Sequence, residues 1–211
     1  MGKNENMKLT GAEEGELGIK ALVQAIPWVG GPISVLYFDR KQERRFKRLE
    51  AFYNELKDEL LAMKDQITSI DEQNKEALVA IIEIINEKVE AEPLQEKRQF
   101  FLNYFKNTLL YPITTNFDER KYFLDTLAAM TILECGILSS LFTISGFISI
   151  GDIERKNIDQ YAIMGAINRL KSYGFLKSYQ GTFDTSSDTV FKENVQVSTF
   201  GKEFHVFCLE V

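Results

Sequence analysis

The sequence predicts a mainly α-helical protein with a single β-hairpin near its C-terminal end. Hydrophobic residues recur at alternating spacings of three and four from residue 46 onward, and a second stripe of helical period follows a polar connection. Alternating strand-like residues flank a polar turn between residues 175 and 198. With 211 residues, 45% of them hydrophobic, the chain is long enough for one large domain or two small ones.

The first residues, 1–17, are polar, acidic and glycine-rich, and we expect a mobile arm without a secretory signal. Residues 19–38 are mostly apolar, but Pro27 and Pro32 interrupt them. This pattern predicts a short helix, a tight turn, and a second helix that begins near Pro32. Beside the turn we expect an apolar patch that covers the core or faces a partner, formed by Trp28, Val29 and Ile33.

A long helix follows, with an apolar seam on one face. Its members are Phe46, Leu49, Tyr53, Leu56, Leu60, Met63, Ile67 and Ile70. A second stripe comprises Leu78, Ile81, Ile82, Ile85 and Val89, and Pro93 limits that helix. Two amphipathic helices with a short polar connection predict an antiparallel hairpin within a helical domain over residues 18–116.

Residues 94–110 predict a further helix, rich in aromatic side chains, and Asn116 is placed to cap the next one. Thr131 and Glu134 have the spacing of a capping box before the helix "ILECGILSSLF". After Gly146 the pattern predicts a helix over residues 158–173 that ends at a left-handed glycine, Gly174. We expect this helix to bury Ile158, Tyr161, Met164, Ile167 and Leu170.

Two strands, in 175–183 and 189–198, and a last helix with Phe200, Phe204, Phe207 and Cys208 complete the chain. The order helix, helix, β-hairpin, helix predicts a winged helix-turn-helix module over residues 117–211. The predicted fold is therefore a helical hairpin or bundle followed by this module.

The segments "AINRLKSYGFLKS" and "VQVSTFGKEFHVFC" resemble the ending of many bacterial winged-helix proteins. The matching residues of the second segment are Val197, Ser198, Gly201, Phe204 and Cys208. The pattern is similar to the abortive-infection alpha group of phage-defence proteins and covers roughly residues 117–211. This resemblance implies a defence component without catalytic residues.

The sequence offers no constellation for catalysis, for a cofactor or for a metal ion. His205 is the single histidine, and it has no neighbour in sequence that would orient it as a general base. Cys135 and Cys208 have no companions at the spacing of zinc ligands, so we expect small core residues. These observations predict a protein that is not an enzyme and has no small-molecule substrate.

A basic cluster opens the long helix in a protein whose net charge is −6. It consists of Arg40, Lys41, Arg44, Arg45, Lys47 and Arg48, and only Asp39 and Glu43 oppose it. Four contacts are possible for this cluster: acidic helices of the same chain, a nucleic acid, an anionic membrane surface, or a partner protein. We expect the cluster to touch an anionic partner.

The helix over 158–173 is where a winged helix reads DNA, and its candidate contacts are Gln160, Asn168, Arg169 and Lys171. Residues 134–211 carry 7 Lys/Arg against 9 Asp/Glu, whereas DNA readers present a positive face. The sequence therefore favours a non-enzymatic binding protein of the bacterial cytoplasm, or of the inner face of its membrane, acting in phage defence. A DNA-binding transcriptional regulator is the alternative, and we expect a protein partner or a dimer.

Overall fold

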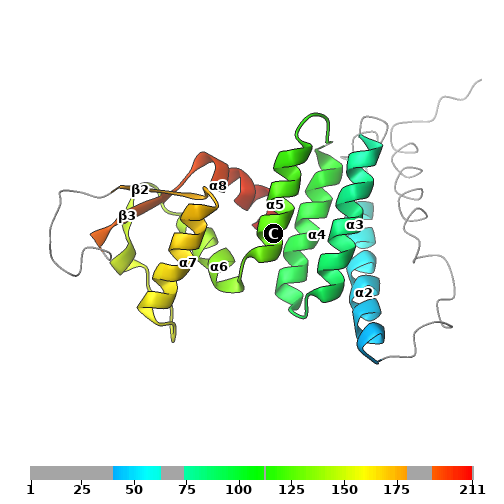
Figure 1. Ribbon diagram of the computed structural model, residues 1–211, viewed down its shortest axis with the longest axis horizontal. Coiled ribbons are helices and arrows are strands. Elements are labelled where there is room, and N and C mark those ends of the chain that lie inside the picture. The colour runs from blue at the N-terminus through cyan, green and yellow to red at the C-terminus, as the bar shows by residue number, and fades with distance from the viewer. Residues whose placement is uncertain (1–39, 63–73, 112, 180–191, 211) are drawn as a thin grey trace, which may run out of the picture. The chain divides into compact units, whose positions relative to one another are not determined.

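A computed structural model describes residues 40–62, 74–111, 113–179 and 192–210. The chain divides into two compact units, Met1–Lys121 and Tyr122–Val211, and Figure 1 shows the elements of both. The predicted arm over 1–17 and the apolar patch of Trp28, Val29 and Ile33 lie outside the described residues. The division into units falls within helix α5, Phe117–Ala129, whereas the sequence places the domain boundary at its start.

Three helices that pack pairwise make up most of the described part of the first unit: α2 (Arg40–Ala62), α3 (Lys75–Ala91) and α4 (Gln95–Leu110). The seam of α2 is buried at Leu49, Tyr53, Leu56 and Leu60, and the stripe of α3 at Leu78, Ile81, Ile85 and Val89. Phe52 of α2 is also buried, although it lies beside the seam rather than in it. The predicted helical hairpin is confirmed, while Met63, Ile67 and Ile70 lie outside the described residues.

A partly buried polar contact joins α2 to α3. The Tyr53 hydroxyl donates to Asn86 Oδ1 over 2.5 Å. Burial raises the pKa of Tyr53 to about 12, although the hydrogen bond with Asn86 opposes this shift. The phenol therefore stays protonated and remains a donor, which fixes the register of the two helices.

An asparagine stands at the N-terminal cap position of both α3 and α5, but its side chain caps only α3. Asn74 caps α3, and its side chain accepts a hydrogen bond from the Ala77 N–H over 3.2 Å. Asn116 occupies the corresponding place before α5, since its backbone carbonyl accepts from the Arg120 N–H. Its side-chain Oδ1 is buried without a hydrogen-bond partner, so the predicted side-chain cap is wrong.

The second unit combines helices with a small antiparallel sheet. After α5 come α6 (Ile132–Phe142), strand β1 (Ile148–Ser149), the 3-10 turn η2 (Ile150–Asp152) and α7 (Gln160–Ser172). Strands β2 (Leu176–Tyr179) and β3 (Asn194–Val197), helix α8 (Thr199–Phe204) and the π-helix η4 (His205–Leu209) complete it. The strand order is β1-β3-β2, with β3 in the centre. The mainly α-helical class and the β2–β3 pair are confirmed, whereas β1 was not predicted.

Aromatic rings fill the core of this unit. Phe123 of α5 contacts Phe200, Phe204 and Phe207, and Phe204 stacks on Phe175 with ring centroids 4.2 Å apart. The predicted capping box at Thr131 and Glu134 and the predicted left-handed glycine, Gly174 with φ 77°, are both confirmed. These local features hold α6 and α7 in place around the rings.

Helix α7 buries only part of the stripe that the sequence predicts: Ile167 and Leu170 are buried, and Met164 is half-buried. It buries Ile163, Ala166, Ile167 and Leu170. Ile158 precedes the helix and is exposed, and Tyr161 is 66% exposed, so their predicted burial is wrong. The physical reason is that a strict spacing of three residues drifts around a helix, so Tyr161 lies about 180° around α7 from buried Leu170.

Candidate docking surfaces of the C-terminal unit

The start of α7 is fixed by polar side chains that point inward. Asp159 accepts a hydrogen bond from the Tyr161 N–H over 2.8 Å. Gln160 Nε2 donates to the backbone carbonyls of Ile150, over 3.0 Å, and Ile153. Gln160 was a candidate for reading a DNA base, but in the structure its amide joins α7 to the η2 turn. Arg155 Nη2 donates to Gly136 O and Ser140 Oγ of α6, which ties the segment between η2 and α7 to α6.

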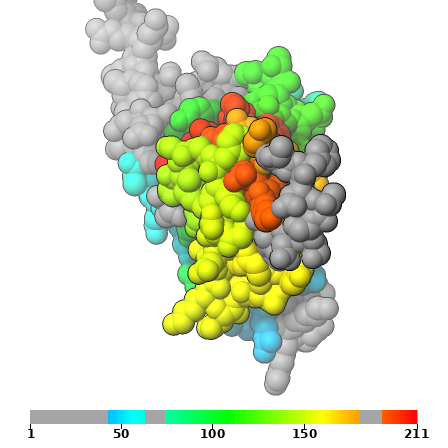
Figure 2. Space-filling view, turned by 90° about the vertical axis from the view of Figure 1, so that its left-hand side faces the viewer, coloured from blue at the N-terminus to red at the C-terminus, as the bar shows by residue number. Residues whose placement is uncertain are grey.

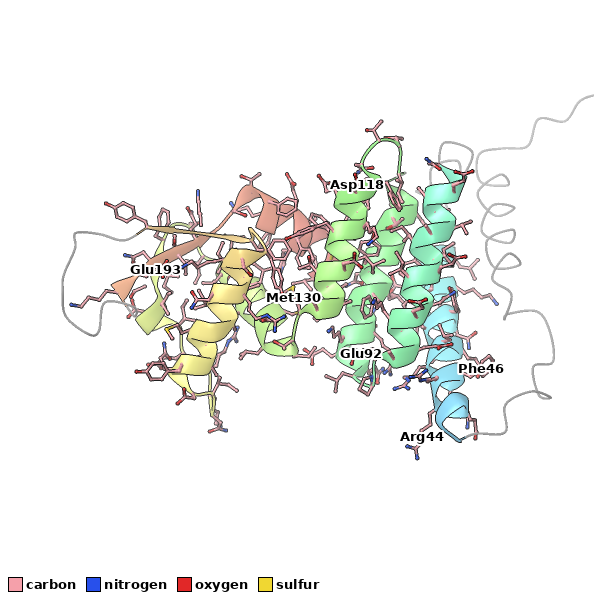
Figure 3. All side chains as sticks on the ribbon, in the orientation of Figure 1. Arg44, Phe46, Glu92, Asp118, Met130 and Glu193 are labelled. Carbon is pink, nitrogen blue, oxygen red and sulfur yellow. The ribbon has the colours of Figure 1, made fainter. Side chains whose placement is uncertain are left out.

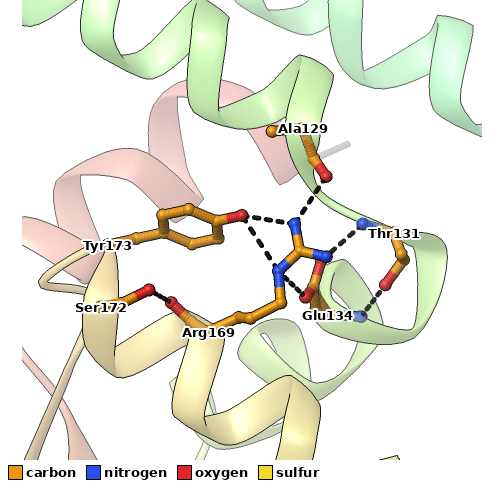
Figure 4. Close-up of polar contacts among 6 residues, drawn as sticks. All are labelled: Ala129, Thr131, Glu134, Arg169, Ser172 and Tyr173. Carbon is orange, nitrogen blue, oxygen red and sulfur yellow. Dashed lines mark hydrogen bonds and ion pairs between the residues drawn. The ribbon is translucent and has the colours of Figure 1, made fainter.

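The end of α7 is held by Arg169, at the centre of the contacts in Figure 4. Arg169 Nε lies 2.9 Å from Oε1 of Glu134, and Arg169 Nη2 donates to the Ala129 carbonyl over 2.9 Å. Nη2 also bonds the Tyr173 hydroxyl over 2.6 Å. This bond and the Glu134 carboxylate raise the pKa of Arg169 further. Arg169 therefore joins the end of α5 and the start of α6 to the end of α7.

Glu134 serves two partners in that cluster. Its Oε2 accepts from the Thr131 N–H over 2.6 Å, which closes the capping box, and its Oε1 faces Arg169. The carboxylate is only 2% exposed, while the Arg169 side chain is 48% exposed. A buried carboxylate needs such partners because its water shell is removed. Sequence reasoning identified the cap but missed the ion pair, since the two residues lie far apart in the chain.

Lys171, another candidate for DNA contact, pairs with Glu193 beside β3, which Figure 3 labels. Burial raises the pKa of Glu193, but hydrogen bonds from Lys171 and Ser178 outweigh it, so the pKa lies below its ordinary value. Of the four predicted DNA contacts on α7, Gln160, Arg169 and Lys171 thus have partners within the protein. Asn168 is exposed.

Five exposed residues of α7 are uncharged and lie on one side of the helix, which we call the α7 face; exposed Arg169 lies on the same side but is paired with Glu134. The α7 face comprises Tyr161, Ala162, Gly165, Asn168 and Ser172. At 100° per residue these positions fall on one side of the helix. The start of α7, yellow in Figure 2, lies at the surface of the unit. Ile158, 40% exposed, adds an apolar side chain just before this face.

A second surface lies on the outer side of the three-stranded sheet, and sequence reasoning missed it. The Phe147 and Tyr179 rings are 49% and 62% exposed, with centroids 6.2 Å apart. Lys177 Nζ lies 5.8 Å from the centre of the Phe147 ring. The two rings come from segments on either side of β3, so no local pattern in the sequence links them.

The basic cluster of α2 lies in the first unit and is less concentrated than its sequence indicates. Arg44 is exposed at the start of α2, as Figure 3 shows. Lys47 Nζ pairs with Glu43 Oε1 over 2.8 Å, one turn apart on the helix, and this contact lowers the pKa of Glu43. Arg45 and Arg48 are half-buried, and the side chains of Arg40 and Lys41 lie outside the described part.

His205 is buried in the second unit, as part of the π-helix. Its ring stacks on Phe142 with centroids 4.0 Å apart, and Nε2 lies 3.2 Å from Ser139 Oγ. Burial lowers the pKa of His205, and the charge of Glu210 offsets this in part. Cys135 and Cys208 are buried and not bonded to each other. Within the described ranges, no three His, Cys, Asp or Glu side chains come together as metal ligands would.

Comparison with protein-family models, with curated proteins and with solved structures found no match to this chain. No single described helix is long and apolar enough to cross a membrane. Helices α5 and α6 pass that test of length and composition together, across a bend of 119°. The contacts of the two surfaces are therefore the observations from which a function is argued.

Proposed function

We propose that this chain is a non-enzymatic binding protein whose second unit is a winged-helix module that docks a partner protein through the α7 face. The winged-helix assignment is supported by the order α6, β1, η2, α7, β2, β3 and by the antiparallel strand order β1-β3-β2. In that arrangement α7 stands where a DNA reader carries its recognition helix, and η2 replaces the helix before it.

The observation that carries the proposal is the chemistry of the α7 face. A helix that reads duplex DNA presents cations to phosphates and long polar side chains to bases. Here those side chains are turned to the protein's own contacts: Arg169 to Glu134, Lys171 to Glu193, and Gln160 to two backbone carbonyls. Besides the paired Arg169, this side of the helix carries an aromatic ring, one amide and small residues, a composition that favours a protein partner over DNA.

Gly165, in the middle of the α7 face, adds to this argument. Glycine within a helix costs about 1 kcal/mol relative to alanine. Gly165 has no positive φ, and a Cβ added to it would meet no atom within 4 Å. Within the described structure, therefore, neither the backbone nor the packing requires glycine. A close approach by the backbone of a partner would require it.

The experiment that tests the proposal replaces Gly165 by alanine. We expect Gly165→Ala to raise the stability of the unit by about 1 kcal/mol, because helix propensity improves. The same change adds a methyl group where the partner approaches, so we expect the complex to be lost. Gly136→Ala is the matched control: it also lies in a helix, and its added Cβ would meet only Arg155 Nη2 at an ordinary 3.9 Å.

Binding is read by introducing a photo-cross-linking residue at exposed Tyr161 in cells that produce the full chain. We expect a cross-linked protein that disappears in Gly165→Ala and persists in Gly136→Ala. Cross-linking that both variants retain would contradict the proposal. Binding of a defined duplex DNA that is lost in Asn168→Ala would instead establish the transcriptional regulator, since Asn168 is the exposed amide on this face.

The biological setting that we propose is phage defence in a bacterial cytoplasm, and it rests on the resemblance of the C-terminal sequence to abortive-infection proteins. Exposed Arg44 of the α2 cluster is the side chain that we propose for an anionic contact of the first unit. A plaque assay links the two parts: protection should be lost in Gly165→Ala and kept in Gly136→Ala. Equal protection by both variants would show that phage defence does not depend on the α7 face.

A further inference from the structure

The outer face of the three-stranded sheet carries an inference that does not depend on docking through α7. We propose that this face binds single-stranded nucleic acid, with bases stacked on Phe147 and Tyr179 and a phosphate beside Lys177. The surface, called the sheet face below, comprises Phe147, Ser149, Lys177, Tyr179, Asn194 and Gln196.

Strand register places these side chains together. Asn194 of β3 pairs with Ser149 on one side and with Tyr179 on the other, and Gln196 pairs with Lys177. Paired residues of antiparallel strands project to the same side of a sheet. The alternate residues Leu176, Val195 and Val197 are buried on the inner side. The ring contact between Phe147 and Tyr179 shows that Phe147, just before β1, projects outward as well.

The two aromatic rings do not belong to the core of the unit, because both are exposed. They lie 6.2 Å apart and are inclined at 56°, so neither covers the face of the other. An exposed ring on a sheet is the platform on which single-stranded bases stack, and each stacked base contributes about 1–3 kcal/mol. Bases in a duplex keep their faces stacked on each other, which leaves these rings nothing to bind.

Charge on the sheet face is complementary to a phosphate backbone. Its six residues carry one cation, Lys177, and no carboxylate. The neighbouring acid, Glu193, is buried on the inner side and paired with Lys171, so it does not oppose an anion there. This arrangement contrasts with the net charge of −6 of the whole chain. Asn194 and Gln196 place two amides, each both donor and acceptor, beside the rings for base edges.

The test measures the fluorescence anisotropy of a labelled oligothymidylate of about twelve nucleotides, a length within the sites of single-strand binders. Titration with the full chain is carried out at about 50 mM salt, where phosphate contacts are strong. We expect Phe147→Ala and Tyr179→Ala each to weaken binding by about 5- to 150-fold, the equivalent of about 1–3 kcal/mol. Tyr179→Phe keeps the ring and should bind as the wild type does.

Two further measurements separate this site from general attraction. Lys177→Gln should lower the slope of log K against log salt by about 0.7, the value for one phosphate contact of a single strand. Tyr111→Ala is the matched control, because Tyr111 is a 59% exposed tyrosine of the other unit and should leave binding unchanged. Circular dichroism of every variant establishes that it is folded.

Three results would overturn the proposal. The first is the absence of any anisotropy change up to about 100 µM protein, the weak end of non-specific affinities. The second is equal affinity for the corresponding duplex, since stacking on the rings would then contribute nothing. The third is wild-type binding by folded Phe147→Ala and Tyr179→Ala. Because none of these results involves Gly165, failure here leaves the docking proposal to its own test.

Discussion

Replacing Arg169 by methionine tests whether this side chain serves the fold, as its contacts indicate, or a DNA partner, as its sequence position predicts. The change removes the cation 2.9 Å from Glu134, a carboxylate that is 2% exposed, and also removes the hydrogen bond to Ala129 O. Breaking a fully buried ion pair costs about 3–5 kcal/mol. Arg169 itself is 48% exposed, so solvent screens the pair, and we expect a loss of about 1–3 kcal/mol.

The loss is measured by urea and thermal unfolding of the full chain, with signals assigned to the second unit. For a unit of about this size, each kcal/mol corresponds to roughly 4–8 °C in Tm. A double-mutant cycle isolates the pair. Glu134→Gln is its second arm, because glutamine also closes a capping box and so preserves the contact with Thr131. We expect Arg169→Met to cost much less in the Glu134→Gln background than alone.

Asn168→Ala is the matched control for this experiment, since Asn168 is the exposed neighbour on the same helix. We expect its stability to stay within about 0.5 kcal/mol of the wild type, as for most surface substitutions. Unchanged stability of Arg169→Met, together with a loss of affinity for a duplex, would refute the reasoning. Arg169 would then be a DNA contact, and its pairing with Glu134 would be incidental.

Two other predictions concern the core of the second unit. Gly201→Ala should destabilise the second unit, because an added Cβ would lie 2.2 Å from Phe175 O. We expect a cost of about 3 kcal/mol or more from this overpacking. A Tm equal to that of the wild type would contradict this expectation. His205 has a lowered pKa in the folded state, so the unfolded chain binds the proton more tightly. The contribution of His205 is therefore present above pH 6.5 and is lost as the pH falls through the folded-state pKa. We expect the free energy of unfolding to fall less steeply between pH 7.5 and 5 in His205→Gln than in the wild type. An identical fall in both proteins would show that other groups cause the pH dependence.

Helices and their caps could be predicted from the sequence because the interactions that set them are local. The seam of α2 follows from side-chain spacing, and Gly174 follows from the need for a left-handed residue after α7. The capping box needs only Thr131 and Glu134, three positions apart. Each of these features depends on residues within one or two turns of the chain, so the pattern of residue types was sufficient.

The sheet and the contacts of α7 could not be predicted in the same way. Strand β1 has two residues, too few for an alternating pattern, and it exists because Ile148 and Ser149 pair with β3. The sheet face brings together Phe147, just before β1, and Tyr179 of β2, so their proximity follows from the fold alone. Likewise, Tyr161 is exposed because a strict three-residue spacing drifts around a helix, and the spacing alone does not show which part of that stripe meets the core.

The contacts of Arg169 also determine how any functional assay of this protein has to be interpreted. Arg169 links the end of α5, the start of α6 and the end of α7, so it orients the α7 face, and its own side chain is 48% exposed beside that face. An Arg169 variant that loses function would therefore fit both a lost DNA contact and a misplaced helix. Stability separates the two, because a misplaced helix lowers it and a lost surface contact does not. Gly165→Ala avoids the ambiguity, since its expected gain in stability and its expected loss of binding have opposite signs.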